Sequence, residues 1–311
     1  MNLEKLLTEE RNSKTINIDQ QSSLGIIEII NQEDQKIATA IQAILPDIAR
    51  TVDYIVAAIQ AGGRLFYLGA GTSGRMGILD ASECPPTYGT HPELVQGLIA
   101  GGAQAILHAV EGAEDSDILA AEDLRGKQLN SSDILIGIAA SGRTPYVMGG
   151  LRYAKSIGCR TVSLTCTPNS EMGRIADQSL TVLTGPEVIM GSTRMKAGTA
   201  QKMVLNMLTT ATMIGLGKVY SNLMVDVQAT NFKLKERAKR IVTIATGVSQ
   251  CQAEEALTTA NGSSKLAIIM ILAGVSADEA SHLLQRGHGF IAKALTLQNV
   301  IPSHANKAGT E

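Results

Sequence analysis

Five short apolar runs, separated by helical stretches, constrain the fold of this chain more than any other feature of its sequence. The runs lie at residues 64–71, 93–101, 133–141, 160–166 and 179–185. Helices are predicted around them at residues 74–84, 103–124, 144–157 and 196–217. Apolar strands that alternate with helices indicate a parallel sheet covered on both faces. The sequence therefore predicts an α/β fold with a five-stranded parallel sheet sandwiched by helices.

The loop after the first run, "GAGTSG" at residues 69–74, matches the G-x-G-x-x-G pattern of dinucleotide-binding loops. A dinucleotide site also requires an acidic residue at the end of the second strand, where it holds the ribose. The second run ends here in "IAGG" at residues 99–102, without an acid. The hydroxyls of Thr72 and Ser73 suit a compact phosphoryl group at a helix N-terminus. The loop therefore favours a phosphate over a dinucleotide.

A second loop, "AASGRTP" at residues 139–145, supports this interpretation. It follows the third run and offers the hydroxyls of Ser141 and Thr144 together with the N–H groups that open the next helix. Neutral hydroxyls and backbone donors can bind phosphate without a lysine. Serine and threonine at a helix start are usually plain N-caps, but two such loops at one sheet edge exceed what capping requires. The two loops together predict a sugar-phosphate site.

Helical segments flank the sheet-forming region on both sides. Isoleucines between residues 26 and 61 recur at helical spacing, and Pro46 predicts a kink or a break among them. After residue 218 no strand pattern follows, and a basic amphipathic helix is expected. Further short helices are predicted at residues 248–260, 264–273 and 277–296. We expect an N-terminal arm and helix at 1–53, a sheet domain at 54–217 and a C-terminal helical cap at 218–311.

The composition argues against several classes of partner. A formal net charge of -2 and the absence of tryptophan give no basis for nucleic-acid binding. The longest apolar run, residues 266–275, is about half of the ~20 residues needed to span a bilayer. The charged N-terminus shows no secretory signal, which predicts a cytoplasmic protein without a membrane partner.

Histidine and cysteine patterns give no case for a metal site. The five histidines show no metal-ligand spacing, and the four cysteines form no C-x-x-C pair. We expect buried, reduced thiols at Cys84, Cys159, Cys166 and Cys251.

Several strings resemble a known family. The "SGRT" loop resembles the phosphate loop of sugar isomerase (SIS) domains, S-x-S-G-x-T, with Ala139 in place of the first serine. Longer strings resemble the N-acetylmuramic acid 6-phosphate etherases: "GGRLFYLGAGTSGRMGILDASECPPTYG" (62–89), "EGAEDS" (111–116), "GPEVIMGSTRMKAGTAQK" (185–202) and "NLMVDVQATNFKLKERA" (222–238). The similarity runs over nearly the whole chain, including the "LTEERN" opening. It implies a homodimer with sites near the subunit interface and no required cofactor.

The resemblance also implies a reaction. The family removes the D-lactyl ether from carbon 3 of N-acetylmuramic acid 6-phosphate, which gives N-acetylglucosamine 6-phosphate and D-lactate. The implied route is an elimination on the ring-opened aldehyde. The proton at carbon 2 leaves, then lactate leaves, and water adds back to the unsaturated aldehyde. This chemistry needs a base and an acid but no redox group.

Two glutamates are the candidate catalytic residues. Glu83 is expected near the end of a helix that stops at or before Cys84, because Pro85 and Pro86 follow. Its position alone favours an exposed side chain, whereas the resemblance implies an active-site glutamate. Residue types alone do not distinguish Glu114 from its acidic neighbours, and the resemblance places the second catalytic carboxylate there. We expect Glu83 to exchange the carbon-2 proton and Glu114 to assist lactate departure and water addition.

The string "GSTRMK" precedes the predicted helix at 196–217 and supplies Ser192, Arg194 and Lys196 as candidate substrate contacts. Either cation could bind the lactyl carboxylate, and a surface charge or an intersubunit ion pair is an equally good interpretation. Two alternative functions stay open. A sugar-phosphate isomerase would share the phosphate loops without needing a second carboxylate. A non-catalytic sensor would bind the sugar phosphate and leave it unchanged.

Overall fold

The computed structural model describes residues 9–227 and 232–298. The first part of the "LTEERN" opening and the C-terminal tail therefore lie outside the described residues. The chain forms two compact units. One contains the residues up to Ser82 together with Pro92–Thr209, and the other contains Glu83–His91 together with the residues from Thr210 onward.

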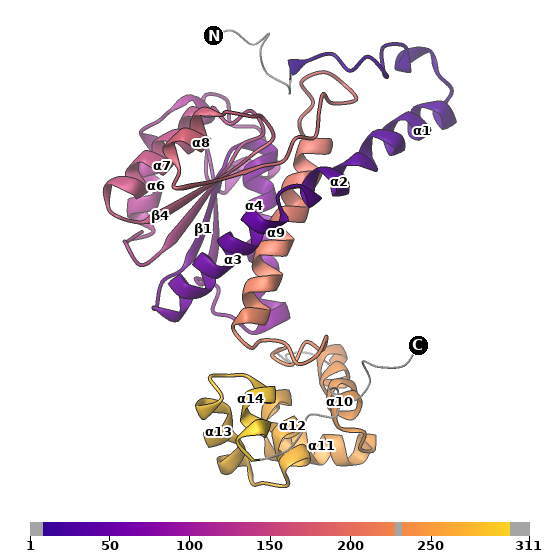
Figure 1. The fold of residues 1–311 in the computed structure, drawn as a ribbon, viewed down its shortest axis with the longest axis vertical. Coiled ribbons are helices and arrows are strands. Elements are labelled where there is room, and N and C mark those ends of the chain that lie inside the picture. The colour runs from indigo at the N-terminus through magenta and orange to yellow at the C-terminus, as the bar shows by residue number, and fades with distance from the viewer. Residues whose placement is uncertain (1–8, 228–231, 299–311) are drawn as a thin grey trace. The chain divides into compact units, whose positions relative to one another are not determined.

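A five-stranded parallel sheet forms the centre of the first unit (Figure 1), which confirms the predicted fold class. Its strands are β1 (Leu65–Gly69), β2 (Val95–Ile99), β3 (Ile134–Ile138), β4 (Arg160–Thr165) and β5 (Gln178–Thr181). All residues of β1 and β3 are buried. Burial on both faces explains why these strands are apolar at every position rather than at alternate positions.

The strand order, β2-β1-β3-β4-β5, determines where a ligand can bind. The chain leaves β1 toward β2 on one side and returns to β3 on the other side of β1. The loops that follow β1 and β3 therefore diverge at the carboxyl edge of the sheet and leave a crevice between them. Open parallel sheets bind ligands at such a switch point. Both predicted phosphate loops flank this crevice.

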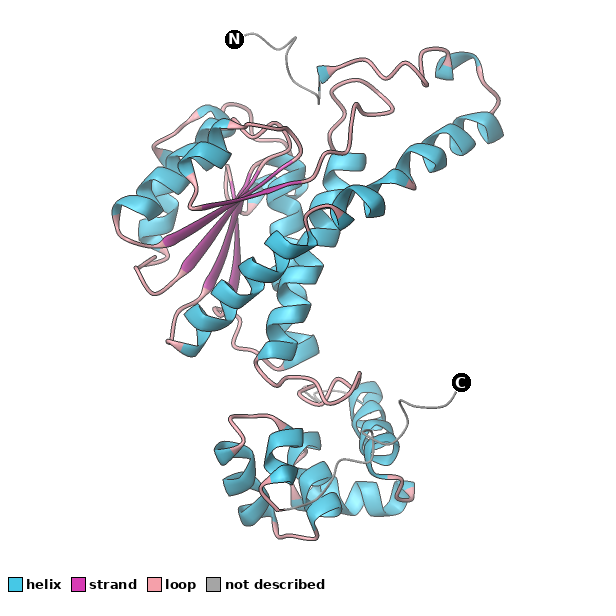
Figure 2. Cartoon of the chain, viewed as in Figure 1, coloured by secondary structure: helices cyan, strands magenta, loops and turns pink. Residues whose placement is uncertain are grey.

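Helices cover both faces of the sheet (Figure 2). One face carries α3 (Leu45–Gln60), α4 (Gly71–Tyr88) and α9 (Lys196–Gly215), and the other carries α6 (Leu119–Gly126), α7 (Pro145–Ser156) and α8 (Glu171–Ile175). The side chains of Phe66, Leu68 and Leu135 pack in one apolar cluster with Tyr146, Val147 and Leu151 of α7. The sheet and α7 therefore share one apolar core.

The N-terminal helical stretch is broken as Pro46 predicted. It comprises α1 (Ser23–Asp34), α2 (Lys36–Gln42) and α3, and Pro46 lies in the first turn of α3. A short 3-10 helix, η3 (Ile18–Gln20), precedes them. Proline is well tolerated at this point because the first helical residues have no intrahelical partner for their N–H groups. The break therefore needs no other cause.

The single helix predicted at 103–124 is wrong. The structure has α5 (Gln104–Leu107), the 3-10 helix η4 (Ala113–Asp115) and α6 in its place. Gly112 separates them with a φ of 74°, a left-handed conformation that glycine adopts readily and that ends a right-handed helix. This break places Glu114 in η4 at the edge of the sheet instead of on a long surface helix.

Helix α4 runs farther than predicted, through Pro85 and Pro86 to Tyr88, although we expected it to end at or before Cys84. The prolines deprive the carbonyls of Ala81 and Ser82 of helical donors. The helix nevertheless closes a further turn, in which the N–H of Gly89 donates to the carbonyl of Pro85 at 2.9 Å. Glu83 is therefore not in the last turn of its helix.

The second unit is helical beyond α9, with α10 (Phe232–Thr246), α11 (Gln250–Thr259), α12 (Ser264–Ala273), α13 (Ala277–Arg286) and α14 (Ile291–Thr296). Ser276 and Glu279 form a capping box at the start of α13. The predicted helix at 277–296 is divided, because Gly289 has a φ of 83°. Cys251 is exposed, unlike the other three cysteines, so the expectation of a buried thiol is wrong there.

No single described helix has both the length and the apolar content that membrane crossing requires. The pair α11 and α12 satisfies them only jointly, and the two helices are bent by 112° relative to each other.

Candidate active site

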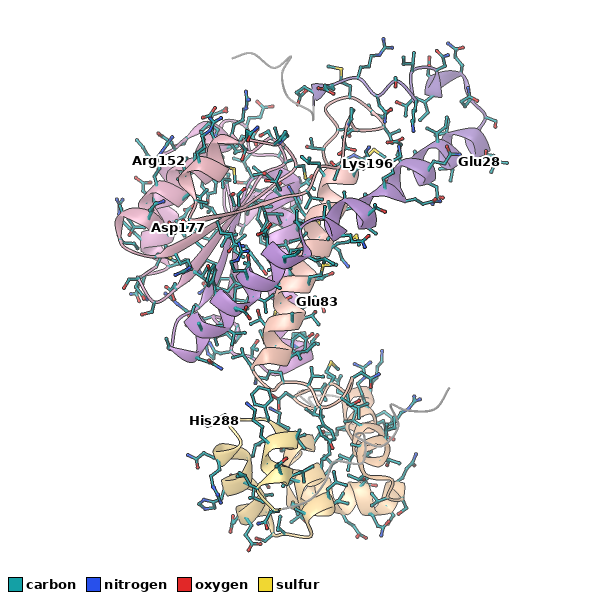
Figure 3. All side chains as sticks on the ribbon, in the orientation of Figure 1. Glu28, Glu83, Arg152, Asp177, Lys196 and His288 are labelled. Atoms are coloured by element: carbon teal, nitrogen blue, oxygen red, sulfur yellow. The ribbon has the colours of Figure 1, made fainter. Side chains whose placement is uncertain are left out.

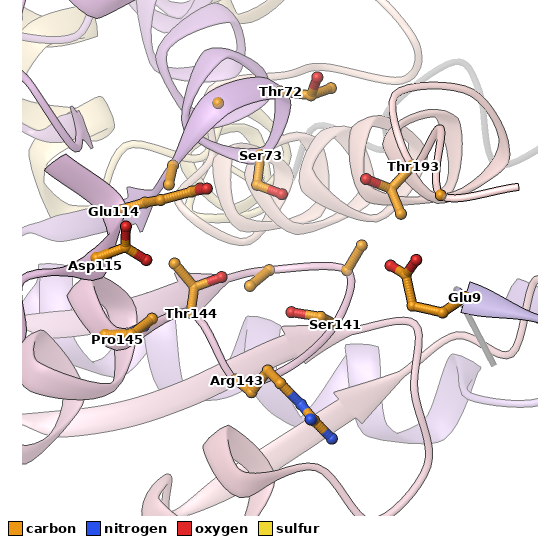
Figure 4. Close-up of a pocket in the computed structure, with 15 residues that line it drawn as sticks. Glu9, Thr72, Ser73, Glu114, Asp115, Ser141, Arg143, Thr144, Pro145 and Thr193 are labelled. Carbon is orange, nitrogen blue, oxygen red and sulfur yellow. The ribbon is translucent and has the colours of Figure 1, made fainter. Parts of the chain in front are cut away.

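A cavity of about 320 Å³ lies between the loops that follow β1 and β3 (Figure 4). We call it the central cavity. Its lining consists of Glu9, Ala70, Gly71, Thr72, Ser73, Glu114, Asp115, Ala139, Ala140, Ser141, Arg143, Thr144, Pro145, Gly191 and Thr193. The structure therefore brings together five predicted site residues, namely Thr72, Ser73, Ser141, Thr144 and Glu114.

Close packing shapes the first loop. A Cβ on Gly69 would lie 2.6 Å from the backbone nitrogen of Gly74, and a Cβ on Gly74 would lie 2.6 Å from the Ile99 side chain. Only glycine allows α4 to begin this close to the strand ends. The first turn of α4 therefore presents Thr72 and Ser73, with its N–H groups, directly to the central cavity.

The second loop reaches the cavity by a tight turn at Gly142. Its φ is 66°, and a Cβ there would lie 2.3 Å from the Cβ of Ser170. Thr144 is the N-cap residue of α7, yet its hydroxyl makes no capping hydrogen bond. Figure 4 shows the hydroxyls of Ser141 and Thr144 turned toward the space between the loops. Thr144 is therefore available to a ligand, contrary to the plain capping interpretation.

Most hydroxyls of the central cavity have no partner within the described chain. Those of Thr72, Ser141, Thr144 and Thr193 make no hydrogen bond with another described residue. Ser73 differs, because its Oγ donates to Oε1 of Gln201 at 3.0 Å. The Nε2 of Gln201 is buried and has no partner among the described residues. Turning this amide over would let Nε2 donate to Ser73 and direct the serine proton into the cavity.

The electrostatic character of the central cavity differs between its parts. The N-termini of α4 and α7 both open toward it, and helix N-termini attract anions. Glu114, Asp115 and Glu9 add carboxylates at the rim. The guanidinium of Arg143 points away from the cavity in Figure 4. An anion is therefore favoured between the two loops, and proton-transfer groups lie beside it. Within residues 9–227 and 232–298, no group of three His, Cys, Asp or Glu side chains could hold a metal ion.

Comparisons with known proteins agree with this geometry. The family model "Glucokinase regulatory protein N-terminal SIS domain" matches residues 47–155, and the SIS domain model matches residues 118–211. The N-acetylmuramic acid 6-phosphate etherase of Photorhabdus laumondii is 57% identical over 95% of this chain and 98% of its own length. The etherase of Clostridium beijerinckii is 58% identical over 95% of this chain and 97% of its own.

The chain belongs to the N-acetylmuramic acid 6-phosphate etherase family. The etherase of Clostridioides difficile is also 57% identical, over 94% of this chain and 96% of its own. Among solved structures, a phosphoheptose isomerase from Neisseria gonorrhoeae aligns with 60% of this chain at a TM-score of 0.45 and 14% identity.

Glu83, the first glutamate expected from the etherase family, does not line the central cavity. It is exposed on α4. Glu114 does line the cavity and is exposed. Of the two expected catalytic carboxylates, Glu114 is therefore the one that lines the central cavity.

The "GSTRMK" segment contributes less to the central cavity of this etherase-family chain than expected. Thr193 lines it, but Ser192, Arg194 and Lys196 do not. Lys196 lies at the start of α9 (Figure 3) and is 1% exposed. Its Nζ lies 2.7 Å from Oε2 of Glu33, so its charge is engaged by a buried partner. This buried ion pair within one chain is neither the surface charge nor the intersubunit ion pair considered from the sequence.

A buried carboxylate organises the same segment. Glu187 is 1% exposed and accepts hydrogen bonds from the backbone N–H groups of Lys196 at 3.0 Å and Ala197 at 2.9 Å. It therefore caps the first turn of α9. Burial raises the pKa of Glu187 even though these two donors act in the opposite direction.

Sequence reasoning missed Glu9, Arg143 and Gln201. The N-terminal arm brings Glu9 to the cavity because two side chains anchor it: Thr15 donates to the carbonyl of Val188 at 2.7 Å, and Asn12 donates to that of Pro186 at 3.3 Å. These contacts join residues more than 170 positions apart, which no local pattern reveals. Arg143 lay inside the recognised "SGRT" string, so its place at the cavity could have been inferred.

Proposed function

We propose that this chain cleaves the D-lactyl ether of N-acetylmuramic acid 6-phosphate with water, releasing N-acetylglucosamine 6-phosphate and D-lactate. It would act as a carbon–oxygen lyase in the catabolism of cell-wall amino sugars. One observation supports this most strongly: a chain of the etherase family has unpartnered hydroxyls at two helix N-termini and the carboxylate of Glu114 in one cavity.

The phosphate of the substrate would lie between the loops after β1 and β3. The first turns of α4 and α7 offer backbone donors, and Ser73, Ser141 and Thr144 offer hydroxyls. Hydrogen bonds from these groups to an ionised phosphate are stronger than those between neutral groups. No lysine is required, because the two helix N-termini supply positive potential.

The reaction follows from the position of the aldehyde in the ring-opened sugar. The aldehyde at carbon 1 acidifies the proton at carbon 2, which a carboxylate can then remove. The bond from carbon 3 to the lactyl oxygen breaks, its electron pair stays on that oxygen, and a carboxylic acid protonates it. Water then adds to carbon 3 of the unsaturated aldehyde, and carbon 2 recovers a proton. A base and an acid suffice for every step.

We propose that a second copy of the chain supplies Glu83 to the cavity that contains Glu114. A homodimer would bring together the two glutamates, of which Glu114 lines the cavity within one chain. Apolar side chains on the first unit support an interface, since Ile189 and Met190, next to Gly191 of the cavity, are 52% and 58% exposed. Exposed apolar residues of this kind are common at protein interfaces.

The activity is tested by measuring lactate release from N-acetylmuramic acid 6-phosphate in ¹⁸O-water. We expect lactate from the wild type and label at carbon 3 of the product sugar. Glu114→Gln should lose most of the rate, about 100-fold or more, because an amide cannot transfer the proton. Glu122→Gln on α6 is the control. Lactate without label at carbon 3 would refute the mechanism, and no lactate from a folded wild type would refute the activity.

Mixing inactive variants tests the shared site. If each cavity combines Glu114 of one subunit with Glu83 of the other, a heterodimer of Glu83→Gln and Glu114→Gln subunits has one intact cavity. Random exchange of subunits should then restore about a quarter of the wild-type rate. No recovery after demonstrated exchange would place both glutamates in one subunit's cavity.

A second candidate function is a non-catalytic sensor of sugar phosphates. The match of residues 47–155 to the regulatory-protein SIS domain favours it. A sensor would bind N-acetylmuramic acid 6-phosphate and leave it intact, so the lactate measurement separates the two functions.

A further inference from the structure

A second cavity, of about 230 Å³, adjoins the central cavity on the first unit. We call it the lateral cavity. Its lining consists of Ala70, Gly71, Arg75, Ala100, Ala105, His108, Ala109, Val110, Glu111, Gly112 and Glu114. Ala70, Gly71 and Glu114 line both cavities. A ligand that occupies both would therefore pass the carboxylate of Glu114.

The loop between β2 and η4 forms the wall of the lateral cavity. Gly101 turns the chain with a φ of 86°, and a Cβ there would lie 2.8 Å from the Cβ of Val110. The loop therefore folds back until Val110 packs against the end of β2. His108 follows α5 as its C-cap residue, and its backbone N–H donates to the carbonyl of Gln104 at 3.1 Å. These contacts fix the backbone of His108, which lines the cavity.

Arg75 places a permanent positive charge in this wall. Its Nε donates to the carbonyl of Ile106 at 2.8 Å, and its Nη2 donates to that of Ala105 at 2.9 Å. The described residues include no carboxylate paired with this guanidinium, although Glu111 and Glu114 line the same cavity. Carbonyls use some of its N–H groups and carry no charge of their own. A guanidinium in this state suits a carboxylate ligand.

Other cations near Glu114 are not suited to that role. Lys196 is paired with buried Glu33, and Arg194 lines neither cavity. Arg143 lines the central cavity, but its guanidinium points away from it (Figure 4). Arg75 and His108 are therefore the groups in the two cavities that can bind a second anion without competing for the phosphate.

We propose that the lateral cavity binds the carboxylate of the lactyl group, with Arg75 as its charge partner and His108 as a further hydrogen-bond donor. This inference rests on the proposed function and specifies where each end of the substrate lies. The phosphate on carbon 6 occupies the central cavity, and the lactyl group on carbon 3 extends into the lateral cavity. Glu114, shared by both, then lies beside the ether oxygen that must be protonated.

Substitution of Arg75 tests the assignment with ligands that carry one or both anionic groups. Arg75→Met should raise KM for N-acetylmuramic acid 6-phosphate about 10- to 100-fold and weaken inhibition by D-lactate similarly, since it removes a charge-assisted contact. Inhibition by N-acetylglucosamine 6-phosphate, which lacks the lactyl group, should be unchanged. Arg152→Met on the exposed side of α7 is the matched control and should change none of these constants.

Arg75 also donates to two carbonyls of the protein, so its substitution removes more than the contact with the ligand. A variant at His108 avoids this complication. His108→Gln leaves those carbonyl contacts intact and should raise KM about 3- to 5-fold, again without affecting N-acetylglucosamine 6-phosphate. Equal weakening of both sugar phosphates by both variants would assign the two residues a structural role and overturn the proposal. Unchanged constants for all ligands would also overturn it. Failure of the proposed function is distinct, because the wild type itself would then release no lactate.

Discussion

Polar side chains of the first unit fall into two groups that differ in how their hydrogen bonds are satisfied. In the central cavity, the hydroxyls of Ser141 and Thr144 make no hydrogen bond with another described residue. Behind the cavity, buried polar groups are paired: Lys196 with Glu33, and Glu187 with the N-terminus of α9. Unpartnered groups at a cavity are available to a ligand, whereas paired groups maintain the frame around it.

The buried carboxylates differ in the direction of their pKa shifts. Two ammonium groups, of Lys196 and Lys36, bind Glu33 and lower its pKa to about 2 although burial acts in the opposite direction. Asp80 is buried as well, and burial raises its pKa despite the opposing hydrogen bonds from Asn206 and Thr209 and the opposing charge of Lys202. The two ammonium groups that bind Glu33 directly therefore outweigh burial, whereas the partners of Asp80 do not.

The largest expected effect comes from breaking the buried pair. Lys196→Met should lower the free energy of unfolding by about 3 kcal/mol, because it leaves the Glu33 carboxylate buried with only the half-exposed Lys36 as a charged partner. Chemical denaturation measures this. Adding Glu33→Leu should recover much of the loss. A stable Lys196→Met that no longer binds substrate would instead place Lys196 among the ligand contacts.

Acid should weaken the same pair. The pKa of Glu33 falls from 4.5 to about 2 on folding, so its contribution is complete above pH 4.5 and is lost as pH falls toward 2. The lost contribution is about 3 kcal/mol. The difference in unfolding free energy between wild type and Glu33→Gln should therefore shrink over this range. A difference independent of pH would show that the carboxylate charge contributes nothing.

Removing an unpartnered hydroxyl should weaken ligand binding and leave the free energy of unfolding almost unchanged, the reverse of what is expected for Lys196→Met. Ser141→Ala and Thr144→Val should each weaken binding of N-acetylglucosamine 6-phosphate about 10-fold, yet change the free energy of unfolding by less than about 0.5 kcal/mol. Ser156→Ala on α7, whose hydroxyl bonds to the carbonyl of Tyr153, is the control. A large loss of stability without loss of affinity would remove the distinction between the two groups.

The smallest effect is expected at Gln201, which shares features of both groups: its Oε1 accepts from Ser73, and its Nε2 has no partner among the described residues. Gln201→Met removes the amide that positions the Ser73 hydroxyl and should weaken phosphate binding about 3- to 5-fold. In the Ser73→Ala background it should cost nothing further, because its effect passes through that hydroxyl. Isothermal titration of the four proteins with N-acetylglucosamine 6-phosphate measures this. Additive losses would exclude a positioning role.

Features determined by local pattern were predictable. The strands and the two loops after β1 and β3 followed from apolar runs that end in small residues, and the break at Pro46 followed from proline geometry. The helix at 103–124 was mispredicted because Gly112 adopts a positive φ that its sequence context does not reveal. The extension of α4 was missed because two consecutive prolines ordinarily end a helix.

The site was less predictable where it depends on long-range pairing. Lys196 is adjacent in sequence to residues of the cavity, yet a glutamate 163 positions away binds its charge. Glu9 reaches the cavity through contacts of the arm with the segment before α9. The etherase resemblance supplied Glu114, which residue types alone did not separate from its acidic neighbours. Such partners become visible only once the chain is folded.

The glycines at the start of α4 have a consequence for variation in this chain. A Cβ on Gly74 would lie 2.6 Å from the side chain of Ile99, and a Cβ on Gly77 would lie 2.8 Å from that of Tyr67. One residue inserted between Gly71 and Gly74 would rotate the following residues by about 100° around the helix axis. Other side chains would then replace the two glycines against the strands. The spacing of these glycines from the loop is therefore a property that α4 must preserve.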